Sequence, residues 1–172
     1  MMVQKRVDAG DADAMEFLAS KYYNGCPRLG LKKNVPRAIE LFTDAAELGS
    51  ARAQSQLGGL YYNGDGVEKD EARGVELMQR AAMKGDVMSR CNLGFVEADD
   101  QNYFLALKLW MISAKMGDKR SLDAIRKLFF DGFATKAHYT EAMTGYQDAV
   151  EETKSHQREE ATEEITKSHR RE

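Results

Sequence analysis

The stretch AQSQLGGLYYNGDGVEKD, residues 53–70, contains the parts of one helical hairpin in order. Its small and apolar residues follow at steps of four, one and three, which places them on one stripe of an α-helix: Ala53, Leu57, Gly58 and Tyr61. Gly64 and Gly66 then break the helix, and Asp70 can cap the next one. A second stripe follows and ends at Gly85: Gly74, Leu77, Met78, Ala81 and Ala82. The stretch therefore predicts a helix, a tight loop and a second helix.

The hairpin is repeated along the chain. YYNG occurs at positions 22–25 and again at 61–64, and the first loop, GCPRLG, is longer than its counterpart in the second copy by three positions. NLG at positions 92–94 begins a third copy, and LFFDG at positions 128–132 belongs to a fourth. A repeat period of roughly 32 to 39 residues predicts stacked helix-turn-helix units, here approximately 11–49, 50–85, 86–117 and 118–150.

Small residues recur at one register of the first helix of each unit. Ala19, Gly58 and Gly94 occupy equivalent positions in the first three copies. A glycine inside a helix costs about 1 kcal/mol of helix propensity relative to alanine, so its use here indicates a close contact between helix backbones. One hairpin cannot bury its stripe alone, which means that neighbouring units must cover it.

Composition excludes several classes of protein. The 172 residues carry 25 basic and 28 acidic side chains, and a net charge of -3 argues against nucleic acid as a partner. We find no signal peptide, no apolar run long enough to span a membrane and no glycosylation sequon, so we expect a cytoplasmic protein without a membrane partner. Two cysteines, Cys26 and Cys91, do not suggest a disulfide framework.

No group of side chains in the sequence predicts catalysis or metal binding. The histidines are His138, which we expect at the surface or in a helix cap, and His156 and His169, whose spacing along the tail places them on different faces of a helix. Neither cysteine has a visible base that could activate it. We therefore expect no enzyme, cofactor or metal, and a hydrolase is a remote alternative.

The run from Ala53 to Gly85 resembles the Sel-one-like repeat, a relative of the tetratricopeptide repeat, with Gly74 where the family usually has alanine. The resemblance covers about residues 7–150. It implies an all-α fold, a right-handed α-α superhelix (solenoid) of about four helix-turn-helix repeats. It also implies a non-catalytic scaffold or adaptor that binds a protein or peptide on its concave face.

Residues 132–161 resemble a variety of these proteins found in algae such as diatoms, which often carry a RING-type zinc module ahead of the repeats. This chain has no paired cysteine spacing for such a module. The alternative function that the resemblance suggests is a substrate-receptor arm in a ubiquitin-linked protein quality-control complex.

First helices line the inner face of helical solenoids, so residues of those helices that lie off the packing stripe are the candidates for partner binding. Three pairs share a register in successive units: Tyr23 and Tyr62, Gln54 and Arg90, and Gln56 and Asn92. We expect Tyr22 and Tyr61 to take the buried slots beside Tyr23 and Tyr62. We expect the chain to be a monomer whose partner is a protein or peptide.

The end of the chain, residues 151–172, differs from the repeats. It contains almost no apolar side chains, so we expect a charged helical extension or a disordered tail, with Glu163 and Lys167 spaced for a helical ion pair. Among the large rings that remain, we expect four to fill the core: Trp110, Phe129, Phe130 and Phe133.

Overall fold

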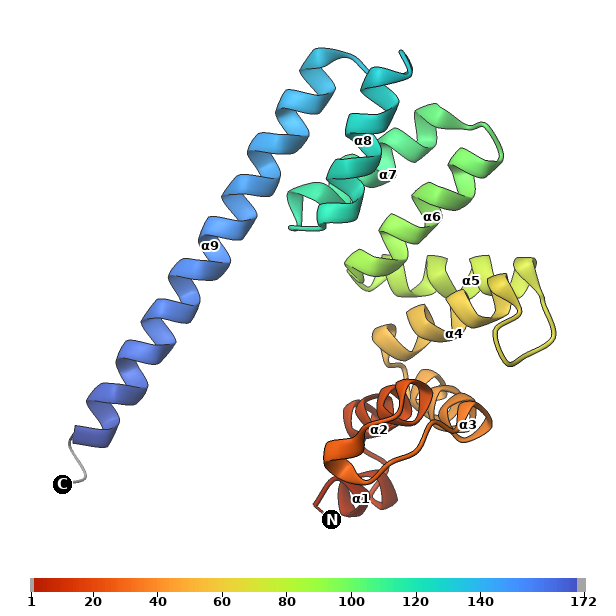
Figure 1. Cartoon of the computed structure of the whole chain (residues 1–172), viewed down its shortest axis with the longest axis vertical. Coiled ribbons are helices and arrows are strands. Elements are labelled where there is room, and N and C mark those ends of the chain that lie inside the picture. Colours follow the sequence, from red (N-terminus) through yellow and green to blue (C-terminus); the bar gives the residue numbers. More distant parts are fainter. Residues whose placement is uncertain (1, 170–172) are drawn as a thin grey trace. The chain divides into compact units, whose positions relative to one another are not determined.

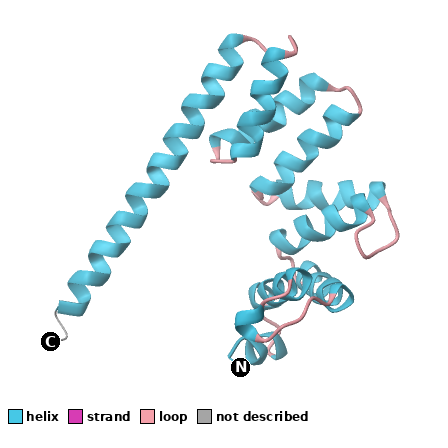
Figure 2. Ribbon diagram, viewed as in Figure 1, coloured by secondary structure: helices cyan, strands magenta, loops and turns pink. Residues whose placement is uncertain are grey.

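The computed structural model describes residues 2–169, without the side chains of residues 158, 159 and 161–169. Within that part every regular element is a helix, joined to the next by a turn or short loop (Figure 1, Figure 2). The chain divides into two compact units, residues 1–93 and 94–172. The boundary falls inside α6 (Val87–Asp99).

Unit one contains the first two predicted hairpins. Its elements are α1 (Met2–Asp8), α2 (Ala12–Asn24), the 3-10 turn η1 (Pro27–Leu29), α3 (Val35–Glu47), α4 (Ala51–Asn63), α5 (Glu71–Met83) and the first part of α6. α2 packs on α3, and α4 packs on α5. Four of these helices begin at a side chain that accepts a backbone N–H, as helix caps do: Asp11, Asn34, Ser50 and Asp70.

The closest helix contact of the second hairpin is made by two glycines. A Cβ atom on Gly58 would lie 2.6 Å from Met78 Cγ and 2.9 Å from the Gly74 carbonyl oxygen. A Cβ atom on Gly74 would lie 2.7 Å from the backbone nitrogen of Tyr62. The equivalent positions of the first hairpin are Ala19 and Ala38, both fully buried. The predicted close contact therefore exists, and in the second hairpin it requires glycine on both helices.

Unit two contains the rest of α6, followed by α7 (Tyr103–Lys115), α8 (Lys119–Phe130) and α9 (Lys136–His169). The short loop after α6 turns at Gln101, whose φ of 61° is left-handed. Gly94 again marks a close contact, since a Cβ atom there would lie 2.6 Å from Trp110 Cδ1. Trp110 is buried, and Phe95 packs edge-on against its ring at 5.0 Å between centroids.

Burial in the third and fourth repeats confirms one part of the aromatic prediction and overturns another. Trp110 lies in the core as expected and Phe129 is half-buried, but Phe130 and Phe133 are 77% and 54% exposed, so their placement in the core is wrong. The buried stripe of α8 runs through Leu122, Ile125 and Leu128. Phe130 is two residues past the last of these, which rotates it to the solvent side.

α9 begins as part of the repeat fold and continues past it. Its first turns pack on α7 and α8, with Ala142 fully buried. From Glu151 to Gln157 every side chain is exposed, while the helix itself continues to His169. The predicted Glu163–Lys167 pair and the His169 side chain lie outside the described residues.

Candidate partner-binding surface

All six residues proposed for partner binding lie in unit one. Gln56 is exposed and Gln54 is buried. The other four are half-buried: Tyr23, Tyr62, Arg90 and Asn92. Residues that share a sequence register therefore differ in their burial.

Gln54 and Arg90 make the same structural contact in successive repeats. The Gln54 side-chain amide donates to the Ala46 carbonyl at 3.2 Å, and the Arg90 guanidinium donates to the Ala82 carbonyl at 2.8 Å. Each bond links the first helix of a repeat to the last turn of the helix before it. Gln54 is only 7% exposed, so it offers a partner little surface. The shared register of these two residues is explained by the junction between repeats.

The four tyrosines of the two YYNG sequences do not divide into buried and exposed pairs as expected. All four are half-buried. The Tyr61 ring carries the Arg73 guanidinium 4.1 Å from its centroid, and the Tyr23 ring carries Lys33 Nζ at 5.6 Å. The expectation of buried slots for Tyr22 and Tyr61 is therefore wrong, because both rings pack at the edge of the core and remain partly exposed to solvent.

Phe17 is a surface residue that the sequence reasoning missed. When the two YYNG sequences are aligned, Phe17 falls on Gln56 and so shares the register of Gln56 and Asn92 in the first repeat. Phe17 is 42% exposed, and Lys21 Nζ lies 4.8 Å from the centre of its ring. The sequence contained the signal for Phe17, because extending the alignment from Gln56 back to the first repeat identifies it.

One ion pair connects the first helices of the two hairpins. Arg52 Nη1 of α4 lies 3.9 Å from Glu16 Oε2 of α2. Burial raises the pKa of Glu16, and Arg52 acts in the opposite direction. We call six exposed or half-exposed residues of the first helices α2, α4 and α6 the first-helix surface: Phe17, Tyr23, Arg52, Gln56, Tyr62 and Asn92.

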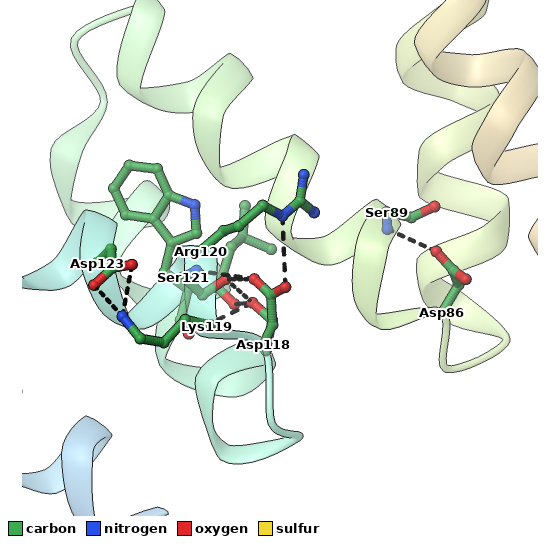
Figure 3. Close-up of polar contacts among 10 residues, drawn as sticks. Asp86, Ser89, Asp118, Lys119, Arg120, Ser121 and Asp123 are labelled. Atoms are coloured by element: carbon green, nitrogen blue, oxygen red, sulfur yellow. Dashed lines mark hydrogen bonds and ion pairs between the residues drawn. The ribbon is translucent and has the colours of Figure 1, made fainter. Parts of the chain in front are cut away.

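A hydroxyl and carboxylate cluster in unit two has the elements of a reactive site but is structural. The Ser113 and Ser121 hydroxyls are 2.8 Å apart, and Ser121 Oγ donates to Asp118 Oδ2 at 2.7 Å (Figure 3). Asp118 also accepts the Ser121 backbone N–H at 2.8 Å, which makes it the N-cap of α8. Both serines are fully buried, so the cluster holds α7 to α8 rather than meeting a substrate.

This cluster predicts opposite effects for two serines at one repeat register. Ser121→Ala removes the hydrogen bonds of its hydroxyl to Ser113 and Asp118 and is expected to lower the free energy of unfolding by about 1–2 kcal/mol. Ser89, at the equivalent position of the preceding repeat, is equally buried, and its hydroxyl has no hydrogen-bond partner among the described residues. Ser89→Ala is therefore expected to leave stability unchanged or to raise it. Chemical denaturation of both variants measures the difference, and equal losses would contradict the assignment.

The histidines and cysteines are the remaining candidates for catalysis or metal binding, and the contacts described for them are structural. His138 and Thr135 form a reciprocal helix cap, in which each side chain accepts the other's backbone N–H at 3.3 and 3.2 Å. His156 lies 3.1 Å from Glu160. Cys91 is buried and Cys26 is half-buried. Over residues 2–169, no three His, Cys, Asp or Glu side chains whose positions are described gather so as to hold a metal ion.

A helix that crosses a membrane must be both long and apolar. Over the residues that the structure describes, no helix combines the length and the apolar character needed to cross a membrane.

Comparison with known proteins identifies the repeats. The family model of the Sel1 repeat matches residues 12–50 and 51–86, which coincide with the two hairpins of unit one. Residues 12–86 thus resemble two successive Sel1 repeats. Human protein sel-1 homolog 2 is 33% identical over 95 residues, which are 55% of this chain and 13% of that protein. The chain thus spans about an eighth of the length of this relative.

Two solved Sel1-type structures resemble most of the chain. One is a protective antigen of uropathogenic Escherichia coli with an SLR fold, 28% identical with a TM-score of 0.69, covering 88% of this chain and 32% of that one. The other is a Sel1 repeat protein of Oxalobacter formigenes, 27% identical with a TM-score of 0.70, covering 87% of this chain and 62% of that one. The predicted all-α Sel1-type solenoid fold is confirmed, and Sel1 repeats in general mediate protein–protein interaction.

Proposed function

We propose that the chain is a non-catalytic adaptor that holds a protein or peptide on the first-helix surface of its Sel1 repeats. The observation that supports this most directly is the register shared by Phe17, Gln56 and Asn92, which places a side chain available to a partner on successive first helices. Aromatic side chains that are partly exposed, such as Phe17 and Tyr23, are common anchors at interfaces.

The proposal excludes Gln54 from the contact and gives Arg90 a positioning role. Both side chains bond carbonyl groups at junctions between repeats, so their replacement would weaken the fold together with any binding. Tyr23, Gln56, Tyr62 and Asn92 stay as proposed contact residues, and Phe17 and Arg52 join them. We do not propose the quality-control role that the resemblance suggests, because the chain spans only 13% of the human relative.

A matched pair of glutamines tests the surface. Gln56 on α4 and Gln79 on α5 are both exposed in the middle of a helix, but only Gln56 lies on the first-helix surface. Gln56→Arg is expected to weaken binding of a protein captured from native extract by about tenfold, because a long charged side chain then enters the contact. Gln79→Arg is expected to bind as the wild type does.

Affinity capture, followed by titration of the purified captured protein, measures the difference. Equal binding by the wild type and both variants would show that the first-helix surface is not the contact. Equal loss in both variants, with helicity preserved in each, would show that the added charge weakens binding wherever it is placed, and would contradict a contact confined to the first-helix surface.

A further inference from the structure

The segment that joins α2 to α3 is basic in a chain whose net charge is negative. Between Glu16 and Glu40 there are five cationic side chains and no carboxylate side chain: Lys21, Arg28, Lys32, Lys33 and Arg37. Arg37 is paired with Glu40 at 2.7 Å. Within the described part of the chain, none of the other four is in a salt bridge. Lys21 lies on α2; the other three lie on the joining segment itself, and we call Arg28, Lys32 and Lys33 the basic loop surface.

Backbone bonds fix the loop that carries these charges. The Cys26 N–H donates to the Leu31 carbonyl at 2.8 Å, and the Leu31 N–H donates back to Cys26 at 3.0 Å. Between them η1 forms one 3-10 turn, and Gly30 completes it in the left-handed region with a φ of 67°. The Asn34 N–H donates to the Tyr22 carbonyl at 2.7 Å, which ties the end of the loop to α2. A loop ordered in this way loses little conformational entropy when it binds.

The positive charge is a feature of this loop and is not shared by the equivalent loop of the second repeat. The equivalent segment of the second repeat, residues 65–71, has one cation, Lys69, among four acidic side chains: Asp65, Glu68, Asp70 and Glu71. Arg28 belongs to the GCPRLG segment that makes the first loop longer than the second. The loop of the first repeat is therefore basic where the equivalent loop of the second repeat is acidic.

Apolar surface lies beside the cations. Leu29, at the tip of the loop, is 39% exposed. Lys33 lies over the ring of Tyr23, a residue of the first-helix surface, so the two surfaces meet at this ring. We infer that the basic loop surface binds an acidic segment of the protein partner, with an apolar side chain of that segment against Leu29 and Tyr23; this inference rests on the proposed function.

The surroundings favour an acidic polypeptide over nucleic acid. The acidic loop of the second repeat lies in the same unit, and α2 itself carries Asp13 and Glu16. These carboxylates repel a continuous phosphate backbone, whose binding needs a clear basic excess. A short acidic segment with a few charges can match the three cations of the basic loop surface, whereas a continuous phosphate backbone extends beyond them.

The test uses the full chain and defined probes. Fluorescence anisotropy measures binding of a short labelled peptide of glutamate, leucine and glycine, of the same peptide with glutamine for glutamate, and of an oligouridine. The loop variant is Arg28→Gln/Lys32→Gln/Lys33→Gln. The control variant, Lys127→Gln/Lys136→Gln/Lys154→Gln, removes three exposed charges of unit two and changes the net charge by the same amount.

The expected result is that the wild type and the control bind the acidic peptide about tenfold more tightly than the loop variant does, and that the preference weakens as salt rises. The glutamine peptide is expected to bind all three proteins equally weakly. Equal binding of the acidic and glutamine peptides, or equal losses in the loop and control variants, would overturn the inference while leaving the Gln56 result intact. Tighter binding of oligouridine than of the acidic peptide would overturn it in favour of nucleic acid.

Discussion

Valine in place of Gly58 is expected to lower the free energy of unfolding by about 3 kcal/mol, because α4 and α5 cannot separate without losing the core between them. A Cβ atom at this position already lies 2.6 Å from Met78 Cγ and 2.9 Å from the Gly74 carbonyl oxygen. Valine adds two methyl groups to that contact. Thermal and chemical unfolding, followed by far-UV circular dichroism, measures the loss.

Two alanine variants sharpen this prediction. Gly74→Ala introduces the residue that the family usually has, and alanine gains about 1 kcal/mol of helix propensity over glycine. We nevertheless expect a net loss of about 1–2 kcal/mol, because the new Cβ atom meets the Tyr62 nitrogen at 2.7 Å and the Gly58 oxygen at 2.8 Å, and backbone atoms cannot turn aside.

Gly59→Ala is the matched control. Gly59 neighbours Gly58 in α4, and a Cβ atom there would have no atom within 4 Å. This variant is expected to be more stable than the wild type by up to about 1 kcal/mol. A stabilised Gly74→Ala variant would contradict the contact between the two glycines, and destabilisation by Gly59→Ala would show that α4 does not tolerate substitution for other reasons.

The repeat allowed much of the fold to be predicted from the sequence, since each hairpin reuses one packing solution. Small residues at one register and glycines at the ends of helices identified the helix pairs, because backbone contact and left-handed turns leave few other residues possible. Phe130 shows where this reasoning fails. LFFDG aligns with LYYNG, but Phe130 lies two residues past the buried Leu128 on α8, so its ring is on the solvent side of the helix.

The candidate surface was predictable only in part. Sequence register shows which residues are equivalent, but it does not show whether a polar side chain faces solvent or a carbonyl group. Gln54 and Gln56 are two residues apart on α4, yet Gln54 bonds Ala46 while Gln56 is exposed. The basic loop was missed for a different reason: summed over the whole chain, its charges are cancelled by carboxylates that lie elsewhere.

Trp110 and Gly94 are expected to show strongly non-additive effects on the stability of unit two. Trp110→Ala leaves a cavity where a buried indole was and is expected to cost about 3–4 kcal/mol. Gly94→Ala alone is expected to cost about 1–2 kcal/mol, because its Cβ atom would lie 2.6 Å from Trp110 Cδ1 and 2.9 Å from Cε2.

In the Trp110→Ala background the same Gly94→Ala change no longer meets the indole. It is then expected to be neutral or to raise stability by up to about 1 kcal/mol through helix propensity, which gives a coupling of about 2 kcal/mol in a double-mutant cycle. Far-UV circular dichroism follows all four proteins, since the chain has one tryptophan and two of the variants lack it. Additive losses would mean that Gly94 is required for a reason other than the ring, because a clash between two groups must vanish when either one is removed.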